Sequence, residues 1–280
     1  MRPKVILQLK GGSEMSEIVR SELRGRVRWV TLDNPEKKNA LDRAAMAALG
    51  DSFRASDADD ETRVVVLTGA GKAFCTGADL VAAQKSLRPE GAAPKSEAAS
   101  GPHDSEFNAT IRALWNCRKP VIAAVNGIAA GFGCSLVLAS DVRIASSAAR
   151  LSLVFVKRGL ALDGGASFFL PRLAGLNGLE MALTGDVVSA EEAARLGLVN
   201  RVVPEAELHD HASAFAERMA KNAPLALAAI KQAVHRALGA GLGEVLADEL
   251  TTVKRLVRTE DVREGIASFL EKRDPVFRGR

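Results

Sequence analysis

Residues 120–135 of the sequence are Pro-Val-Ile-Ala-Ala-Val-Asn-Gly-Ile-Ala-Ala-Gly-Phe-Gly-Cys-Ser. The first six residues form a continuous apolar run, which is typical of a strand that is covered on both faces in a parallel sheet. Asn126-Gly127 ends that strand, and the glycines at 131 and 133 predict a tight turn into a helix that begins near Gly133. A buried strand, a glycine-rich turn and a helix in this order predict an α/β fold.

A second segment, residues 64–80, has the same arrangement. Val64 to Leu67 is an apolar run rich in β-branched residues that ends at Thr68-Gly69, and glycines follow at positions 71 and 77. Val142 to Ile144 begins a third run of this kind. Strands that alternate with helical segments at this spacing predict repeated strand-helix units in a mostly parallel, right-handed arrangement.

Other segments extend this core at both ends. Ile18 to Leu23 and Val27 to Leu32 predict a hairpin around Gly25, and Leu41 to Ala55 has helical periodicity. After Pro204 the pattern is almost wholly helical, with helices expected over His209 to Ala220, Pro224 to Leu238, Leu242 to Val257 and Glu260 to Lys272. We therefore expect an N-terminal extension over residues 1–14, a core over 15–203 and a helical C-terminal region over 204–280.

One internal segment differs in composition. Residues 82–106 are rich in Ala, Pro, Ser, Gly and charged residues without periodicity, which predicts a mobile surface segment. Two interpretations of this segment stay open, a lid over a site and a tolerated insertion.

The composition limits the classes of function. The chain has 280 residues, 47% of them hydrophobic, and no apolar run approaches the roughly 20 residues of a membrane span. The net charge of +4 is scattered and the chain has no Tyr, so a basic face with stacking aromatics for nucleic acid is not expected. Cys75, Cys117 and Cys134 lack metal-ligand or redox spacing. With no signal-peptide pattern, these features predict a cytoplasmic protein without a metal site.

The two glycine-rich turns predict unpaired backbone N–H groups at the starts of helices, where a partial positive charge accumulates. Two such turns facing each other would form an oxyanion hole, a pair of donors for a negatively charged oxygen. Because glycine-rich strand-to-helix turns are common in parallel sheets, the residues alone leave this interpretation and a structural one open.

Five motifs in one unbroken order resemble the crotonase family, the enoyl-CoA hydratases and isomerases. They are Asn34 to Leu41, Phe74 to Leu80, Asn126 to Cys134, Leu183 to Val199 and Phe269 to Arg273, and the resemblance runs from about Val27 to the C-terminus. It implies a crotonase (ClpP-like) spiral of strand-strand-helix units with a helical C-terminal region. It also implies an acyl-CoA thioester substrate, no cofactor beyond the coenzyme A of that substrate, and a homotrimer or a hexamer of two trimers.

The resemblance implies roles for particular residues. The first oxyanion donor falls on the N–H of Ala78, after Gly77, and the second falls on the N–H of Phe132, after Gly131, where many members have Gly or Ala. Lys272 would be a phosphate partner, for its own or a neighbouring subunit. The other residues that would bind the substrate or its coenzyme A are Lys37, Lys38, Ala40, Cys75, Thr76, Gly77, Asp79, Leu80 and Gly131.

The chain departs from the hydratases at two positions. A typical hydratase has two glutamates around one water, so that one activates the water and the other handles the transferred proton. The matching positions hold Ser135 and Phe155, which cannot exchange protons in that way. We therefore do not expect water addition by the usual route, and we place Phe155 among the substrate-binding residues.

A different carboxylate, Asp163, lies in Gly159 to Leu173, a segment that resembles the branch containing the isomerase of bacterial phenylacetate degradation. Apolar neighbours would raise its pKa, which suits a single acid/base; the expected neighbours are Leu160, Leu162, Phe168 and Phe169. The opposing interpretation is an N-cap for a helix that begins near Gly164, because Asp is a favoured cap residue.

Three functions stay open at this point. The favoured one is isomerisation of an unsaturated acyl-CoA through Asp163. The second is hydration through a water held by Ser135 and Asp163, and the third is a CoA-binding scaffold without chemistry. Asp79 and Asp141 are expected to be structural, and four histidines are expected at the surface: His103, His209, His211 and His235.

Overall fold

The structure is a computed structural model of the chain and describes residues 18–82 and 105–280. The expected extension over residues 1–14, His103 and most of the segment over 82–106 lie outside the described residues.

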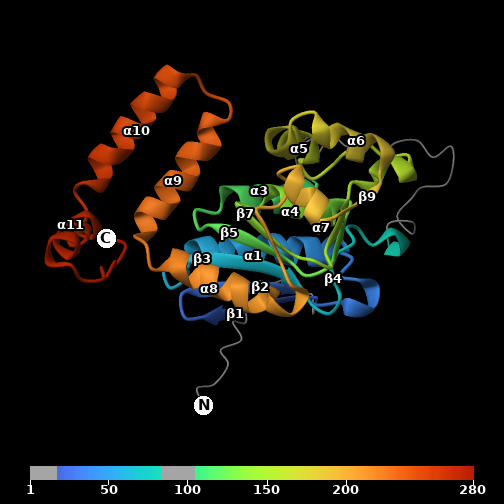
Figure 1. Cartoon of the computed structure of the whole chain (residues 1–280), viewed down its shortest axis with the longest axis horizontal. Helices are drawn as coiled ribbons and strands as arrows, with labels where there is room; N and C mark the ends of the chain where they lie inside the picture. The colour runs from blue at the N-terminus through green and yellow to red at the C-terminus, as the bar shows by residue number, and fades with distance from the viewer. Residues whose placement is uncertain (1–17, 83–104) are drawn as a thin grey trace, which may run out of the picture.

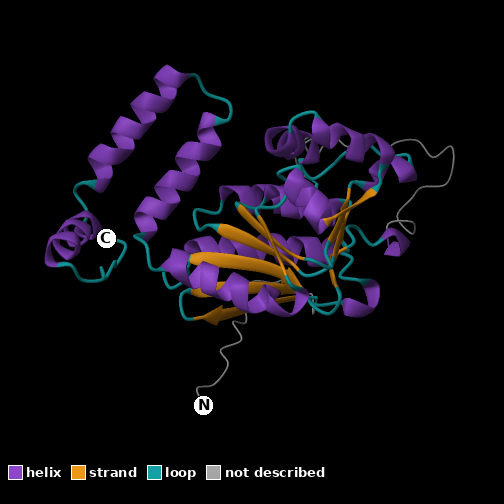
Figure 2. Cartoon of the chain, in the orientation of Figure 1, coloured by secondary structure: helices purple, strands orange, loops and turns teal. Residues whose placement is uncertain are grey.

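A six-stranded sheet in the order β1-β2-β3-β5-β7-β10 forms the centre of the molecule (Figures 1 and 2). In the described part of this sheet, β1 pairs antiparallel with β2 across the predicted turn at Gly25, and the other neighbours are parallel. Every residue of β3 and β5 is buried except Thr68, which is partly buried, so both runs are covered on both faces as predicted. The strands are β1 (Val19–Arg24), β2 (Val27–Leu32), β3 (Val64–Gly69), β5 (Val121–Val125), β7 (Val142–Ser146) and β10 (Arg201–Val203).

A second, four-stranded sheet in the order β4-β6-β8-β9 completes the spiral. Each turn adds one strand to the large sheet and the next strand to the small sheet, so that β4 follows β3, β6 follows β5 and β8 follows β7. Helices then lead to the next turn, which confirms the strand-strand-helix spiral. The elements are β4 (Ala73–Cys75), α3 (Glu106–Asn116), β6 (Ile128–Ala130), α4 (Phe132–Ala139), β8 (Arg150–Ser152), a 3-10 helix η2 (Val154–Arg158), α5 (Ala166–Ala174), α6 (Asn177–Thr184), β9 (Val187–Ser189) and α7 (Ala190–Arg195).

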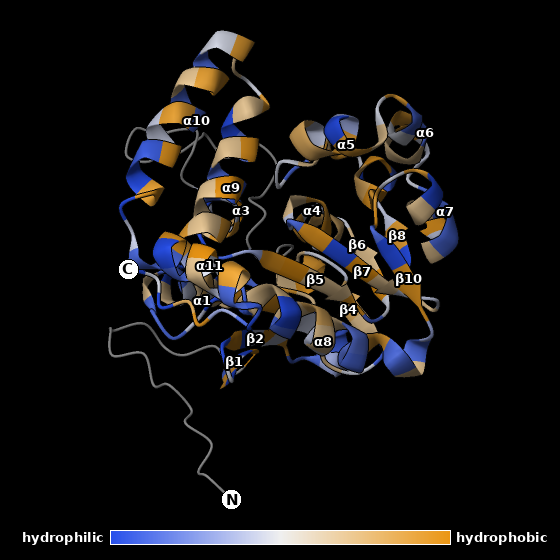
Figure 3. Ribbon diagram, turned by 60° about the vertical axis from the view of Figure 1, so that its left-hand side comes forward, coloured by the Kyte–Doolittle hydropathy of each residue, from blue (hydrophilic) through white to orange (hydrophobic). Residues whose placement is uncertain are grey.

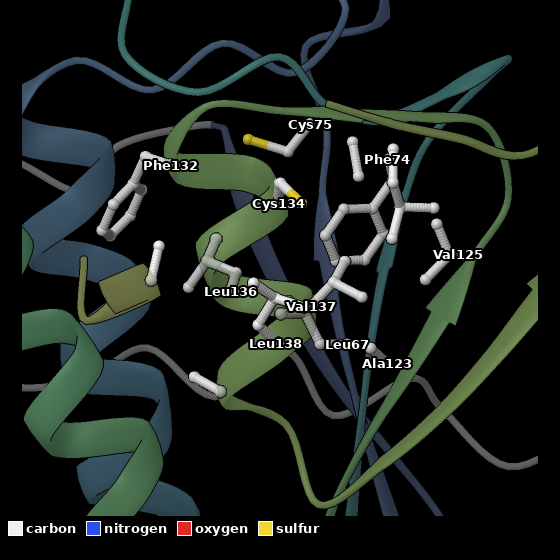
Figure 4. Close-up of a cluster of buried hydrophobic side chains, with 14 of the residues drawn as sticks. Leu67, Phe74, Cys75, Ala123, Val125, Phe132, Cys134, Leu136, Val137 and Leu138 are labelled. Atoms are coloured by element: carbon white, nitrogen blue, oxygen red, sulfur yellow. The ribbon is translucent and has the colours of Figure 1, made fainter. Parts of the chain in front are cut away.

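Two hydrophobic clusters fill the space on either side of the large sheet. Val65 and Leu67 of β3 belong to the cluster shared with α1 (Arg43–Ala58), α3 and α4, whereas Val64 and Val66 belong to the cluster under α8 (Leu208–Ala220). This alternation is the period of a strand. Figure 4 shows part of the first cluster, in which α4 packs against the strands that carry Leu67, Ala123 and Val125.

Three C-terminal helices, α9 (Pro224–Ala237), α10 (Leu242–Leu256) and α11 (Glu260–Glu271), extend from the core on the side opposite to α5 and α6 (Figure 1). Their bounds agree with the predicted helices within one residue at each end. α8 differs from them because it covers the sheet, so in packing it belongs with the core. The boundary placed between residues 203 and 204 stays a prediction.

None of the helices within the described ranges is sufficiently long and apolar to cross a membrane.

Candidate active site

The segment after β4 is held by an isolated parallel bridge between Leu41 and Ala78. The Leu41 N–H donates to the Gly77 carbonyl at 2.8 Å, and the Asp79 N–H donates to the Leu41 carbonyl at 2.9 Å. These bonds use the groups on either side of Ala78. The Ala78 N–H itself has no acceptor among residues 18–82 and 105–280, which leaves it available to a ligand.

Asn39 anchors this segment, although the sequence analysis gives it no role beyond its place in the motif from Asn34 to Leu41. Its buried amide donates to the carbonyls of Ala73 at 2.7 Å and Phe74 at 3.2 Å, and its Oδ1 accepts from the Asn34 N–H at 2.8 Å. Its φ of 57° lies in the left-handed region, which Asn adopts more readily than most residues. That preference and its place in the motif are the sequence signals that could have found it.

The second turn, Gly131-Phe132, lies directly against the first. A Cβ atom on Gly77 would lie 2.9 Å from the Ala130 carbonyl oxygen and 3.0 Å from the Phe132 nitrogen. Phe132 is the first residue of α4, where an N–H has no partner inside the helix, and this N–H has no acceptor within the described part of the chain. The structure therefore brings together the two N–H groups that the sequence predicts as donors.

The ring of Phe132 is accommodated in the core. It is 1% exposed and meets the ring of Phe107 from α3 edge-to-face, with centroids 4.9 Å apart. Figure 4 shows it at the start of α4, away from the strand that carries Val125. A phenyl group at this position therefore leaves the backbone N–H free.

The turn that carries Asp163 rests on α4. Gly164 has a φ of 56°, and a Cβ atom there would lie 2.8 Å from a ring carbon of Phe132 and 2.8 Å from Cβ of Ser135. α5 begins after this turn with Gly165 as its N-cap and without a side-chain cap bond. The interpretation of Asp163 as an N-cap is therefore wrong, and its carboxylate is not used to close the helix.

Asp163 has the properties of a proton acceptor. No side-chain partner of its carboxylate lies among the described residues. Although Asp163 is exposed in the single chain, partial desolvation by its neighbours raises the pKa of its carboxyl to about 6. A carboxylate with such a pKa can both accept and return a proton near neutral pH.

The apolar surroundings of Asp163 differ in part from the prediction. Phe169 is 6% exposed and packs against Gly165, and Leu162 packs partly against the core, as expected. Leu160 and Phe168 are 56% and 38% exposed in the single chain, so they are less shielded from solvent than Phe169. The remaining neighbours of the turn come from α3 and α4, namely Ile111, Phe132 and Ser135.

The two positions at which the sequence resemblance predicts the hydratase glutamates hold Ser135 and Phe155, whose side chains lack a carboxylate. The Ser135 hydroxyl is fully buried and donates to the Asp163 carbonyl at 3.0 Å. Phe155 of η2 is 6% exposed, with its ring 3.9 Å from the point where a Cβ of Gly131 would lie. Neither residue offers a second carboxylate beside Asp163.

The residues expected around coenzyme A surround the first turn. Lys37 and Lys38 are exposed, and Lys37 Nζ lies 2.9 Å from the Asp79 carboxylate, which raises the pKa of Lys37 by hydrogen bonding and charge. Thr76 donates its N–H to the Lys38 carbonyl at 3.2 Å. The other members of this set are Ala40, which is partly buried, Cys75, which is buried, and Leu80, which is 52% exposed.

Asp79 and Lys272 have different positions relative to this site. The Asp79 carboxylate accepts from the N–H groups of Val81 at 3.0 Å and Ala82 at 3.1 Å, so it has the structural bonds expected of it. Lys272 ends α11 with a φ of 55°, on the far side of the molecule from α5 (Figure 1). Within one chain, Lys272 is not brought to the other predicted site residues.

His235 is not a surface residue, contrary to the prediction. Its ring stacks on Trp115 with centroids 3.4 Å apart, and its Nε2 lies 3.1 Å from the Asp141 carboxylate. Lys231 Nζ lies 2.7 Å from the same carboxylate. Although burial favours the neutral acid, these two donors lower the pKa of Asp141, which therefore has a structural role.

His209 is exposed and lies over the ring of Trp29, and His211 is partly buried. All three cysteines are free and buried, and burial raises the pKa of Cys75 and Cys134 to about 12. No group of three or more His, Cys, Asp or Glu residues in the described ranges could hold a metal ion.

Comparison with known proteins gives a consistent family. The family model described as enoyl-CoA hydratase/isomerase matches residues 22–280. The chain is 36% identical to 1,2-epoxyphenylacetyl-CoA isomerase of Escherichia coli over 95% of its own length and 100% of the relative. It is 39% identical to carnitinyl-CoA dehydratase of Salmonella enteritidis over 95% and 100% of the two lengths. The crystal structure of an enoyl-CoA hydratase from Polaromonas sp. JS666 matches with a TM-score of 0.85 at 36% identity, covering 92% of this chain and 99% of that one.

Proposed function

The chain belongs to the enoyl-CoA hydratase/isomerase family, and on this premise we propose that it moves the double bond of an unsaturated acyl-CoA with Asp163 as its single acid/base. The observation that carries the proposal is an unpartnered carboxylate of raised pKa on a turn that rests on Phe132, the residue with the second free N–H. The family and the acyl-CoA class of substrate are established by the comparisons, and the isomerase chemistry is our proposal.

The proposed reaction needs one base and two backbone donors. The Asp163 carboxylate removes a proton from one carbon of the acyl chain, and the electron pair moves through the unsaturated system to the thioester oxygen. The N–H groups of Ala78 and Phe132 stabilise the negative oxygen of this enolate. The Asp163 carboxyl, whose proton can exchange with solvent, then returns a proton two carbons along, so the double bond shifts and the composition of the thioester is unchanged.

Hydration is the competing function, and relatives named as dehydratase and isomerase are similarly close. Two observations argue against it. The Ser135 hydroxyl already donates to the Asp163 carbonyl, and the second glutamate position holds the buried Phe155. A water in the site would therefore find one carboxylate and lack the second group that hydration requires.

Incubation with 2-enoyl-CoA and 3-enoyl-CoA thioesters in deuterated water separates the three functions. Isomerisation moves the double bond and introduces deuterium at the exchanging carbons. Hydration gives a 3-hydroxyacyl-CoA, and a scaffold binds the thioesters and turns over none of them. Either of the last two results would contradict the proposal.

The activity should depend on an ionised carboxylate with a pKa of about 6. Because the base must be ionised to accept a proton, we expect kcat/KM to be constant above about pH 7 and to fall roughly tenfold for each pH unit well below 6. The measurement is the rate of double-bond migration from pH 4.5 to pH 9. Binding of a saturated acyl-CoA over the same range is the control for ionisation of the ligand. An acid limb at the pKa of an ordinary aspartate, near 4, would contradict this assignment.

We further propose that coenzyme A lies along the surface formed by Lys37, Lys38 and Thr76. Its phosphates would be bound in addition by Lys272 of a neighbouring subunit. Lys272 lies away from the site of its own chain (Figure 1), so the second part of this proposal requires an oligomer. Lys38 is exposed and the N–H of Thr76 binds its carbonyl, which supports a recognition segment of fixed shape.

A homotrimer, alone or paired into a hexamer, is the assembly that we propose. Apolar residues recur along α9 and α10 (Figure 3), and on α10 they follow spacings of four, four, three and four residues along one face. Each is more than half exposed in the single chain: Leu242, Leu246, Leu250, Val253 and Val257. A continuous apolar stripe of this kind is typical of a subunit interface.

Glutamate at both Leu246 and Leu250 should therefore dissociate the assembly. Light scattering is expected to give three or six times the mass of one chain for the wild type, and a smaller mass for the double variant, because burial of unpaired charge is unfavourable. Glu249→Lys, at an exposed polar position of the same helix, is the matched control and should leave the mass unchanged. A monomeric wild type would contradict the assembly.

A further inference from the structure

We propose that Ser135 is a positioning residue, whose buried hydroxyl holds the turn that carries Asp163 above the second N–H donor. The inference rests on the proposed role of Asp163 and adds a function for the side chain that stands where a hydratase has its first glutamate. It explains why a small hydroxyl, and not another acid, occupies this place.

The Asp163 carbonyl accepts two hydrogen bonds. The Ser135 hydroxyl donates to this oxygen at 3.0 Å, and the Ala166 N–H donates to it at 3.0 Å. Two donors from different elements, α4 and α5, fix the direction of one peptide group. Because the peptide that follows Asp163 is fixed, the direction in which the carboxylate leaves the backbone is constrained as well.

The Gly164 turn packs closely on α4. A Cβ atom on Gly164 would lie 2.8 Å from Cβ of Ser135 and 2.8 Å from the Phe132 ring, so no gap separates the turn from α4. Phe132 and Ser135 are three residues apart and therefore lie on the same face of the helix. One turn of α4 thus supplies both the Phe132 N–H donor and the side chain that supports the Asp163 turn.

Ser135 is small and uncharged, and both properties suit its position beneath the turn. A glutamate at this fully buried position would have to displace the Gly164 turn, and it would place a second carboxylate beside Asp163. Like charges at short distance oppose ionisation of both acids. A neutral hydroxyl holds the turn while Asp163 remains the one carboxylate contributed by α4 and the turn.

Ser135→Ala in the full-length protein tests the proposal. We expect kcat for double-bond migration to fall about tenfold with KM within about twofold, because small displacements of a reacting group cost up to about 100-fold in rate. The acid limb of the pH profile should also move, since the environment of Asp163 changes. Ser135→Cys, which keeps the size but donates weakly, should lie between the wild type and Ser135→Ala.

Ser140→Ala is the matched control. Ser140 is 3% exposed, ends the same helix, and donates to the Leu136 carbonyl at 2.9 Å, so its loss removes a comparable bond away from the turn. We expect its kcat and pH profile to equal those of the wild type. A purely structural role of Ser135 predicts equal losses in both variants with lowered melting temperatures, and this result would overturn the proposal.

Two further outcomes distinguish this inference from the proposed function. Wild-type kcat and pH profile in Ser135→Ala would overturn the positioning role and leave Asp163 as the base. Wild-type activity in Asp163→Asn would overturn both. If Ser135→Ala fails to fold, the Ser135→Cys variant decides, because a wild-type pH profile and kcat in that variant contradict the proposal.

Discussion

Asp163→Asn is expected to slow double-bond migration about 10³-fold while acyl-CoA binding stays within about twofold. Positioned acid/base groups contribute typically 10²- to 10⁴-fold to a rate, and the described residues offer no second carboxylate at the matching positions, Ser135 and Phe155. The asparagine side chain has similar size and cannot accept the proton. Single-turnover measurement of the migration, with binding of a saturated acyl-CoA by calorimetry, separates the chemical step from binding.

The stability of Asp163→Asn provides the control for folding. Since the pKa of this carboxyl is raised to about 6 in the folded state, the folded protein binds the proton more tightly than the unfolded chain. Ionisation therefore lowers the free energy of unfolding as pH rises from about 4 to about 6, and this loss is complete at neutral pH. At pH 7 the variant should be at least as stable as the wild type, and below about pH 4 the difference should vanish.

A loss of activity with a lower melting temperature at pH 7 would instead indicate that Asp163 supports the fold. Unchanged migration rates would remove Asp163 from the mechanism. Asp79→Asn is a useful comparison because that carboxylate binds Lys37 and the N–H groups of Val81 and Ala82. We expect it to affect binding and stability more than the chemical step.

The large sheet could be predicted from sequence because its signals are local. The runs at Val64 and Pro120 are apolar at every position, and this pattern specifies a strand covered on both faces without knowledge of its neighbours. The C-terminal helices were likewise predicted within one residue because their periodicity is continuous. Apolar residues on these helices are exposed in the single chain. Periodicity therefore predicts which face of a helix is apolar, but it does not predict which surface covers that face.

The details of the site depend on contacts between distant residues. Ser135 binds the carbonyl of a residue 28 positions away, and His235 binds Asp141 at a separation of 94. Sequence placed His235 at the surface because nothing near it in the chain indicates the Trp115 ring on which it stacks. Asp163 was ambiguous for the same reason, since an N-cap and a free carboxylate have the same local pattern until the start of α5 is known.

Gly77→Ala is expected to reduce the rate of migration about 10³-fold by opening the oxyanion hole. Gly77 has a φ of 90°, where a side chain is strained, and its Cβ would lie 2.9 Å from the Ala130 carbonyl and 3.0 Å from the Phe132 nitrogen. Both contacts are with backbone, which cannot rotate aside. Loss of one oxyanion donor typically costs 10²- to 10³-fold, and this substitution disturbs the spacing of both.

The close contact of the new Cβ with the Gly131-Phe132 turn can be relieved by movement of either turn, and both movements disrupt the oxyanion hole. If the Gly131-Phe132 turn moves away, the two N–H groups separate. If Gly77 changes conformation instead, its carbonyl loses the 2.8 Å bond from Leu41, and the bridge that orients Ala78 is broken.

Gly25→Ala separates this effect from backbone strain. Gly25 has a φ of 60° in the β1–β2 turn, and a Cβ there meets no atom within 4 Å. The variant should lose the stability that the strained φ alone costs and keep its activity. Retention of more than about a third of the wild-type rate in Gly77→Ala would show that these two turns are not the oxyanion site.

The affinities of the Gly77→Ala variant for two ligands distinguish loss of the oxyanion hole from loss of coenzyme A binding. An interaction made more strongly in the transition state than in the ground state affects transition-state analogues far more than substrates. An acyl-CoA analogue with a negatively charged oxygen in place of the thioester carbonyl should therefore lose affinity by about the factor lost in kcat/KM. A saturated acyl-CoA, held by the proposed Lys37 and Lys38 surface, should lose much less. Equal losses for both ligands would mean that Gly77 supports binding of coenzyme A and not the enolate.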